Sequence, residues 1–272
     1  MKFKGIAIIT FVLALCLTVS MAWAENIVIK GSTTVLPIAQ KTAEAYMKQN
    51  PDVKISISGG GSGNGIKALI DGSTDIADSS RFIKAKEVKL AVEKGRYPVP
   101  FAVAYDCIIP VVHPTNNLGN ITMVQLKDIY MGKFKNWKEI GGPDRPMVVI
   151  SRDTSSGTYE VWHKKVLKKQ RVFPGALLQA SNGAVAQAVS KNKNAIGYIG
   201  LGYLDKTVKA LTVDGVTGSE ATTLNGTFPV SRPLYMFTPG WPKGEVLKFI
   251  NFVMNPEKGQ QYVSEAGYVP LY

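Results

Sequence analysis

The segment NIVIKGSTTVLPIAQKTAEAYMK (residues 26–48) shows the unit from which this chain is built. Asn26–Lys30 is a short strand-like run, and Val35–Lys48 has the apolar spacing of an amphipathic helix, with Pro37 tolerated in its first turn. Between them lies Gly31–Thr34, a turn of glycine and hydroxyl residues. A strand, a short turn and a helix in succession predict an α/β fold.

Strand-like and helix-like segments alternate along the rest of the chain. The pattern predicts strands at residues 53–58, 75–77, 98–114, 147–150, 195–199 and 227–237. It predicts helices at residues 66–70, 85–94, 123–130, 157–167, 184–191 and 244–262, the last broken at Pro256. This alternation indicates a mixed sheet flanked by helices. The run 98–114 is long enough to pass between two halves of the molecule, whereas Pro229 and Pro233 place 227–237 at a sheet edge.

Four stretches place glycine and hydroxyl residues near the start of a helix-like pattern: Gly31–Thr34, Gly59–Gly65, Asp78–Arg81 and Arg152–Thr158. A helix start leaves about four N–H groups without intrahelical partners and carries roughly half a positive charge. Small residues let an anion approach these groups, and each hydroxyl adds a donor. Taken singly, each stretch is also explained by a capped helix or a tight turn. Together they predict one anion site in a cleft between two halves, beyond the carboxyl ends of the strands.

The glycine-rich stretch Gly59–Gly65 does not match the motifs that bind nucleotides or carry a nucleophile. Its glycines miss the dinucleotide fingerprint, and Ile66–Lys67 stands where a P-loop has lysine and a hydroxyl residue. Around Ser62, Asn64 replaces the last glycine of a nucleophile elbow. Arg152 is a sharper signal, because a guanidinium presents a fixed fork of donors to two oxygens of a tetrahedral oxyanion. Charge-assisted hydrogen bonds contribute roughly 1.5–3 kcal/mol each and micromolar binding needs about 8 kcal/mol, so several loops must act together.

The first residues have the pattern of a secretory signal. Lys2 and Lys4 precede an apolar run from Ile6 to Val19, and Ala22–Ala24 has the small-residue spacing that signal peptidase cleaves. We expect cleavage after Ala24, and therefore a protein that is periplasmic or otherwise exported.

Two alternatives concern the same segment. A membrane anchor is one, but the apolar run is short of the ~20 residues that a span needs. A lipid anchor on Cys16 is the other, with bulky Leu15 standing against it. Cleavage leaves Cys107 as a lone cysteine in an apolar run, so we expect a buried thiol and no disulfide.

The net charge of the chain and the motifs it lacks exclude several classes of function. The net charge of +12 attracts anions, although a solvated basic surface explains it as well. No RNA-reading, zinc-finger or metal-ligating pattern occurs, so we expect no nucleic-acid partner, metal or cofactor. The only histidines are His113 and His163, and neither is placed as a base, which disfavours a secreted phosphate-ester hydrolase that uses Ser62 or Ser156.

The chain resembles the periplasmic phosphate-binding proteins of high-affinity phosphate ABC transporters. The resemblance covers essentially the whole mature chain and rests on residues 31–34, 61–65, 80–81, 132–142 and 152–158. It implies a type II periplasmic-binding fold, with two α/β lobes hinged by crossing strands. We expect lobe I to comprise residues 25–104 and 235–272 and lobe II to comprise residues 105–234, with phosphate in the cleft between them.

The resemblance also implies the ligand-binding residues and the partners. The expected phosphate ligands are Ser32, Thr33, Thr34, Ser62, Ser80, Arg81, Arg152, Ser155, Ser156, Gly157 and Thr158. The expected protein is a monomer that has no enzymatic activity and delivers phosphate to the permease subunits of an ABC transporter.

One departure from the family concerns the proton of hydrogen phosphate. Some members carry an aspartate where Arg81 stands, and that carboxylate accepts the proton. Here Asp78, Asp153 or a backbone carbonyl are the candidate acceptors, and the choice among them stays open. Such an acceptor would reject sulfate, which has no proton at neutral pH. A receptor for another tetrahedral oxyanion, such as sulfate, is therefore the alternative function.

Overall fold

The computed structural model describes residues 25–272, and the predicted signal segment 1–24 lies outside the described residues. The strands are β1 (Glu25–Gly31), β2 (Val53–Gly59), β3 (Ile76–Ser79), β4 (Val99–Val112), β5 (Asn120–Ile121), β6 (Val148–Arg152), β7 (Leu177–Gln179), β8 (Ala195–Gly200), β9 (Lys209–Ala210), β10 (Thr212–Val213) and β11 (Ser231–Thr238). The helices are α1 (Leu36–Gln49), α2 (Ser62–Asp71), α3 (Ala85–Glu93), α4 (Met123–Tyr130), α5 (Gly157–Lys165), α6 (Asn182–Ser190), α7 (Glu220–Leu224), α8 (Gly244–Met254) and α9 (Gly259–Glu265), with short 3-10 turns η1 (Trp137–Ile140) and η2 (Leu201–Tyr203). None of these helices is long and apolar enough to cross a membrane.

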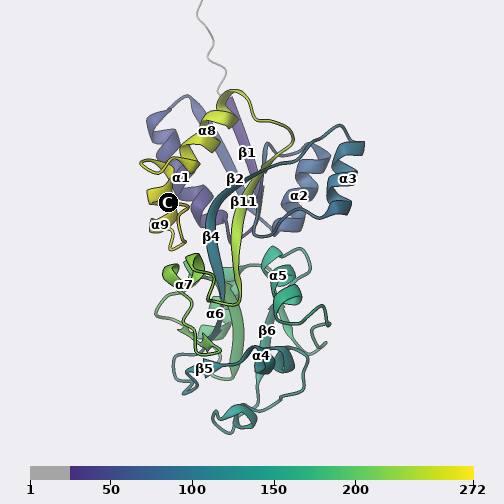
Figure 1. The fold of residues 1–272 in the computed structure, drawn as a ribbon, viewed down its shortest axis with the longest axis vertical. Coiled ribbons are helices and arrows are strands. Elements are labelled where there is room, and N and C mark those ends of the chain that lie inside the picture. Colours follow the sequence, from purple (N-terminus) through teal and green to yellow (C-terminus); the bar gives the residue numbers. More distant parts are fainter. Residues whose placement is uncertain (1–24) are drawn as a thin grey trace, which may run out of the picture.

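A mixed nine-stranded sheet runs through the molecule in the order β2-β1-β3-β11-β4-β8-β6-β7, with β9 beside β4, and β5 and β10 form a separate two-stranded sheet. β1 pairs in parallel with β2 and β3, and β6 pairs in parallel with β7 and β8. The long strands β4 and β11 are antiparallel to each other and join these two parallel sets. Figure 1 shows them crossing from one lobe to the other, with helices around each lobe. The predicted mixed α/β architecture is confirmed.

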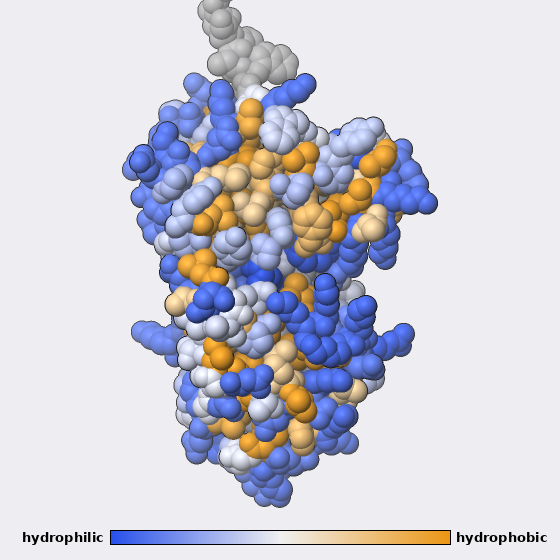
Figure 2. Space-filling model, viewed as in Figure 1, coloured by the Kyte–Doolittle hydropathy of each residue, from blue (hydrophilic) through white to orange (hydrophobic). Residues whose placement is uncertain are grey.

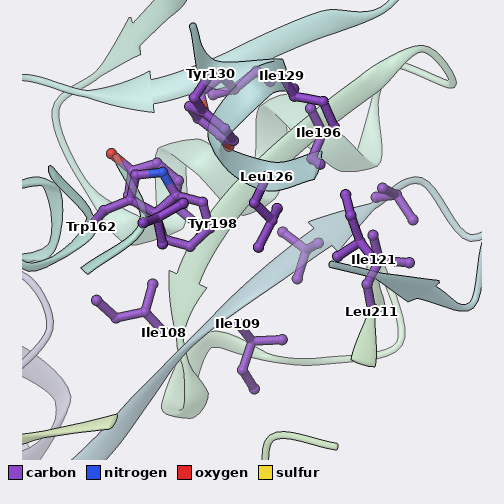
Figure 3. Close-up of a cluster of buried hydrophobic side chains, with 14 of the residues drawn as sticks. Ile108, Ile109, Ile121, Leu126, Ile129, Tyr130, Trp162, Ile196, Tyr198 and Leu211 are labelled. Atoms are coloured by element: carbon purple, nitrogen blue, oxygen red, sulfur yellow. The ribbon is translucent and has the colours of Figure 1, made fainter. Parts of the chain in front are cut away.

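Each lobe has its own large hydrophobic cluster. One cluster is formed by β1, α1, the first half of β4 and the C-terminal helices, and includes Ile29, Ala104 and Phe249. The other is formed by the second half of β4 and the elements that follow it as far as Val230, and includes Cys107 and Tyr198. Figure 3 shows this second cluster, in which the rings of Trp162 and Tyr198 stack with centroids 4.3 Å apart. β4 therefore contributes to both cores.

β11 lies in the middle of the sheet, between β3 and β4, so its predicted edge position is wrong. Pro233 faces Tyr105 of β4, whose N–H and C=O both bond to Val269 on the opposite side. The pair is thus a non-hydrogen-bonded one, in which proline removes no bond from the β4–β11 ladder. On the other side, pairing with β3 begins only at Tyr235. Pro229 lies before β11, which begins at Ser231, so it takes no part in the strand pairing.

The second predicted helix begins earlier than its apolar spacing indicated. α2 starts at Ser62, four residues before the predicted start at Ile66, so Gly63 and Gly65 lie within the helix. Gly61 precedes the helix with φ +99°, a conformation that favours glycine. A Cβ on Gly65 would lie 2.6 Å from the Lys30 carbonyl oxygen, so close packing on β1 explains that glycine.

Candidate functional site

The predicted turns meet where the two lobes face each other. Thr34 before α1 and Thr158 in α5 bring their hydroxyl oxygens to 3.0 Å. The N–H of Gly63 donates to the Ser155 carbonyl at 2.8 Å. These bonds join segments far apart in the sequence, so the structure brings the separate glycine and hydroxyl turns together into one cluster.

The turn before α1 is fixed by contacts to the backbone. Gly31 has φ +141°, and a Cβ there would lie 2.2 Å from the Asp78 carbonyl oxygen. Ser32 donates its N–H to that carbonyl at 2.9 Å, and its hydroxyl oxygen accepts the N–H groups of Thr34 and Val35 at 3.1 and 3.4 Å. A hydroxyl oxygen that accepts two backbone bonds directs its proton elsewhere. Ser32, Thr33 and Thr34 are all buried.

Two predicted residues of one lobe bond to each other, and a third approaches them from the facing lobe. Ser62 is the first residue of α2, and its hydroxyl oxygen accepts the Ser80 N–H at 3.0 Å. The Ser62 and Ser80 hydroxyl oxygens are 3.3 Å apart. A Cβ built on Gly157 of α5 would lie 2.3 Å from the Ser62 oxygen and 2.7 Å from the Ser80 oxygen. This approach of the two lobes therefore requires glycine at position 157.

Arg152 ends β6 and is buried, with 1% of its surface exposed. Its Nε donates to the Gln179 carbonyl at 3.0 Å and its Nη2 to the Ala180 carbonyl at 2.9 Å. Its Nη1 is also buried and has no hydrogen-bond partner among residues 25–272. Burial lowers the pKa of Arg152, and no carboxylate in the described chain forms an ion pair with it. This cation has a spare donor and forms no ion pair within residues 25–272.

The remaining residues of the 152–158 turn divide into two groups. Ser156 caps α5, its hydroxyl oxygen accepting the Tyr159 N–H at 3.2 Å, and both Ser156 and Thr158 are buried. The Ser155 hydroxyl instead bonds to Asp153 and, at 3.2 Å, to the Gly60 carbonyl of the other lobe. Ser156 and Thr158 are therefore inside the cluster, whereas Ser155 forms a contact between the lobes at its rim.

The Arg81 side chain has other partners. Its Nη2 lies 2.7 Å from Glu87 and its Nε lies 2.9 Å from Glu160 of α5. Lys84 also contacts Glu160, at 2.6 Å. These carboxylates neutralise the guanidinium, so the structure places Arg81 in an ion-pair cluster between the lobes.

Sequence reasoning missed two residues of the cluster. Asn182 begins α6, and its Nδ2 donates to the hydroxyl oxygens of Thr33 and Thr34 at 3.2 and 3.0 Å. It follows Ser181 and precedes Gly183, so the turn signal used elsewhere would have found it. Arg232 of β11 also bonds to Thr34, but it lies in a strand-like run and carries no local signal.

The candidate proton acceptors differ in their surroundings. Asp78 is fully buried, burial raises its pKa well above the ordinary value, and its Oδ1 has no hydrogen-bond partner among the described residues. The Asp153 carboxylate accepts the N–H of Ser155 at 2.8 Å. The choice between these groups and a backbone carbonyl stays open.

Beside the cluster, a cleft of about 830 Å³ remains between the lobes. It is lined by Arg81–Lys84 on one lobe, by α5 on the other and by β11. Figure 2 shows the narrow waist between the lobes, where hydrophilic and hydrophobic side chains both lie on the surface. Among the described residues, no group of three His, Cys, Asp or Glu side chains is placed to hold a metal ion.

Comparisons with known proteins agree with this arrangement. Residues 20–257 match the family model of a PBP superfamily domain. The chain is 34% identical over 258 residues to the phosphate-binding protein PstS of Staphylococcus epidermidis, which covers 88% of this chain and 77% of that protein. It is 32% identical to PstS of Borreliella burgdorferi over 98% of this chain and 99% of that protein.

Two solved structures are similar in fold. A substrate-binding protein from Clostridium perfringens, solved with bound phosphate, has a TM-score of 0.85 at 36% identity and covers 91% of this chain and 100% of its own. An ABC-type phosphate transport receptor from Vibrio cholerae has a TM-score of 0.73 at 32% identity, covering 89% and 99%. The predicted two-lobed binding-protein fold is confirmed.

Proposed function

The chain belongs to the PBP superfamily and, within it, to the PstS phosphate-binding proteins, and we propose that it captures inorganic phosphate and delivers it to an ABC transporter permease. Its relatives are named for phosphate binding and phosphate transport. The function requires binding and release without chemical change of the ligand.

One observation carries this proposal: the buried guanidinium of Arg152, at the end of β6 and just before the turn that leads into α5, keeps an unpartnered Nη1. A buried charge without a partner costs several kcal/mol, so such a site is built to receive an anion. Helix starts and hydroxyl donors supply further bonds to a tetrahedral oxyanion.

We assign the phosphate contacts to the buried residues of this cluster. They are Ser32, Thr33, Ser62, Ser80, Arg152, Ser156, Gly157 and Thr158, and Thr34 supports them through its bond to the Thr158 hydroxyl. Arg81 and Ser155 serve in this proposal as contacts that hold the lobes together around the ligand, because their polar groups already bond to Glu160 and Gly60 of the facing lobes.

Two other functions have specific tests. A sulfate receptor would bind sulfate tightly and phosphate weakly. A hydrolase would need a base beside Ser62 or Ser156, yet the described hydrogen bonds of these hydroxyls run only to Ser80 and to the Tyr159 N–H. Turnover of a chromogenic phosphate ester that disappears in Ser62→Ala or Ser156→Ala would support the hydrolase.

The deciding experiment is calorimetric titration of ligand-stripped protein with phosphate, repeated in excess sulfate. We expect tight phosphate binding that sulfate does not displace. X-ray scattering should show a smaller radius with phosphate, because the lobes close on the ligand. Tight sulfate binding without phosphate binding would overturn the proposal.

We further propose that the chain is exported as a monomer, with residues 1–24 removed. Mass spectrometry of the secreted protein checks the cleavage after Ala24, and sedimentation checks the monomer. The division into lobe I (25–104 and 235–272) and lobe II (105–234) is proposed as the unit of motion. Scattering profiles with and without phosphate test that division.

A further inference from the structure

A buried ion pair joins the two strands that cross between the lobes. Arg232 of β11 donates from Nε and Nη2 to Asp106 of β4, at 2.9 and 2.7 Å. Both residues are buried, with 5% of the surface of Arg232 and 0% of that of Asp106 exposed. The other Asp106 oxygen accepts the N–H of Leu201 at 2.8 Å, so the carboxylate is held on both sides.

The same guanidinium reaches hydroxyls of both lobes. Its Nη2 also lies 3.3 Å from the Thr34 oxygen and 3.0 Å from the Thr158 oxygen, and its Nη1 donates to the Ser80 carbonyl at 3.1 Å. Nη2 carries two protons. One goes to Asp106, and the two threonine hydroxyls share the other.

The direction of the hydroxyl protons follows from these contacts. The Thr34 oxygen receives N–H groups from Arg232 and, at 3.0 Å, from Asn182, which fills its two lone pairs. Its own proton therefore has the Thr158 oxygen, 3.0 Å away, as its acceptor. The Thr158 oxygen then accepts from both Thr34 and Arg232, so its proton must be donated to a further group.

We propose that Arg232, held by Asp106, is a positioning residue of the phosphate site that fixes the Thr158 hydroxyl as a hydrogen-bond donor to the bound oxyanion. This inference rests on the proposed function. It also gives the site a preference between the protonation states of phosphate, because a hydroxyl that can only donate favours an unprotonated phosphate oxygen at that position. The dibasic form of phosphate is then bound better than the monobasic form.

The test is a cycle of variants measured by calorimetry with inorganic phosphate. Thr158→Val removes the donor, and the charge-balanced pair Asp106→Leu/Arg232→Met removes its orientation without leaving a buried charge. Each change should weaken phosphate binding by about 10- to 100-fold, the value of one charge-assisted hydrogen bond. Combining all three substitutions should weaken binding no further than the more damaging of the two changes, because both act on the same hydroxyl.

A second readout is the pH dependence of the dissociation constant across the second ionisation of phosphate. In the pair variant the Thr158 hydroxyl can rotate and accept a proton, so the advantage of the dibasic form should shrink. If the pair variant does not fold, Arg232→Lys takes its place in this test. It keeps the charge beside Asp106 but loses the several N–H donors of the guanidinium, so it should show the same flattened pH profile. Thr223→Val, a buried change in α7, is the matched control and should leave binding unchanged.

The outcomes separate this inference from the proposed function. The positioning role would be overturned if the losses of phosphate affinity multiplied in the combined variant. It would also be overturned if the pair variant or Arg232→Lys kept the wild-type pH profile. Either result would leave the proposed function, phosphate binding, standing. Wild-type protein that binds no phosphate would overturn the proposed function itself.

Discussion

Replacing Arg152 with methionine should abolish most of the affinity for phosphate. The substitution keeps a long apolar side chain but removes the charge and the unpartnered Nη1. One charge-assisted hydrogen bond is worth roughly 1.5–3 kcal/mol, and deleting one partner of a buried charge pair costs about 3–5 kcal/mol. The larger figure includes the hydrogen bond. At about 1.4 kcal/mol per tenfold, the dissociation constant should rise by about 100- to 4,000-fold.

The same substitution should leave the stability of ligand-free protein nearly unchanged. Arg152 has no carboxylate partner, so methionine removes a desolvated charge while it leaves the carbonyls of Gln179 and Ala180 without these two donors. These two effects oppose each other. We expect a change in the free energy of unfolding within about 1 kcal/mol, which is roughly 2–4 °C in melting temperature for a chain of this size.

The assays are calorimetric titration with phosphate and thermal unfolding with and without it. In wild type, phosphate should raise the melting temperature in proportion to the logarithm of its concentration over the dissociation constant, and Arg152→Met should lose that shift. Exposed Arg145→Met, in lobe II, is the control for removing one positive charge. Binding of phosphate by Arg152→Met within about twofold of wild type, the range of ordinary surface substitutions, would refute the role of this arginine.

Two further substitutions and one labelling experiment have defined outcomes. Gly157→Ala places a methyl 2.3 Å from the Ser62 oxygen, so overpacking of about 1–3 kcal/mol should weaken phosphate binding about 5- to 140-fold by calorimetry. Unchanged affinity would show that the lobes need not approach this closely. Glu160→Gln removes the ion pair to Arg81 and should speed phosphate release about tenfold in stopped flow, and an unchanged release rate would exclude a role in closure. Burial raises the pKa of Cys107 to about 12, so at pH 8 the thiol is protonated and should react with an aromatic disulfide only after unfolding; labelling of folded protein would contradict its burial.

Local sequence signals predicted the turns because a turn is specified by its own residues. Gly31, Ser62 and Ser156 stand where a positive φ, a helix start or a cap is required, and these needs are visible within a few positions. The order of strands along the chain was equally readable from apolar runs. Pro233 led to the wrong prediction of an edge strand. A proline is tolerated at this central position because the backbone N–H and C=O of Tyr105, the residue opposite, bond to Val269 instead.

The partners of charged side chains could not be predicted in the same way. Arg81 follows a serine just as an anion-binding arginine would, but Glu160 of the other lobe competes for it. Arg232 and Asp106 meet only because β4 and β11 pair in one particular register. Such contacts depend on the tertiary arrangement, so a single sequence shows the residue types without showing which of them meet.

The chain path also determines when each lobe can fold. The core around β1 and α1 needs Phe249 and Val263, which are made last, whereas the other core is built from one continuous segment between Cys107 and Val230. Because synthesis begins at the N-terminus, the first apolar segments therefore stay exposed until the C-terminal helices have been made. The middle segment of the chain can complete its core first and offer β4 as a template, so the beginning of the polypeptide is the last part to reach its final packing.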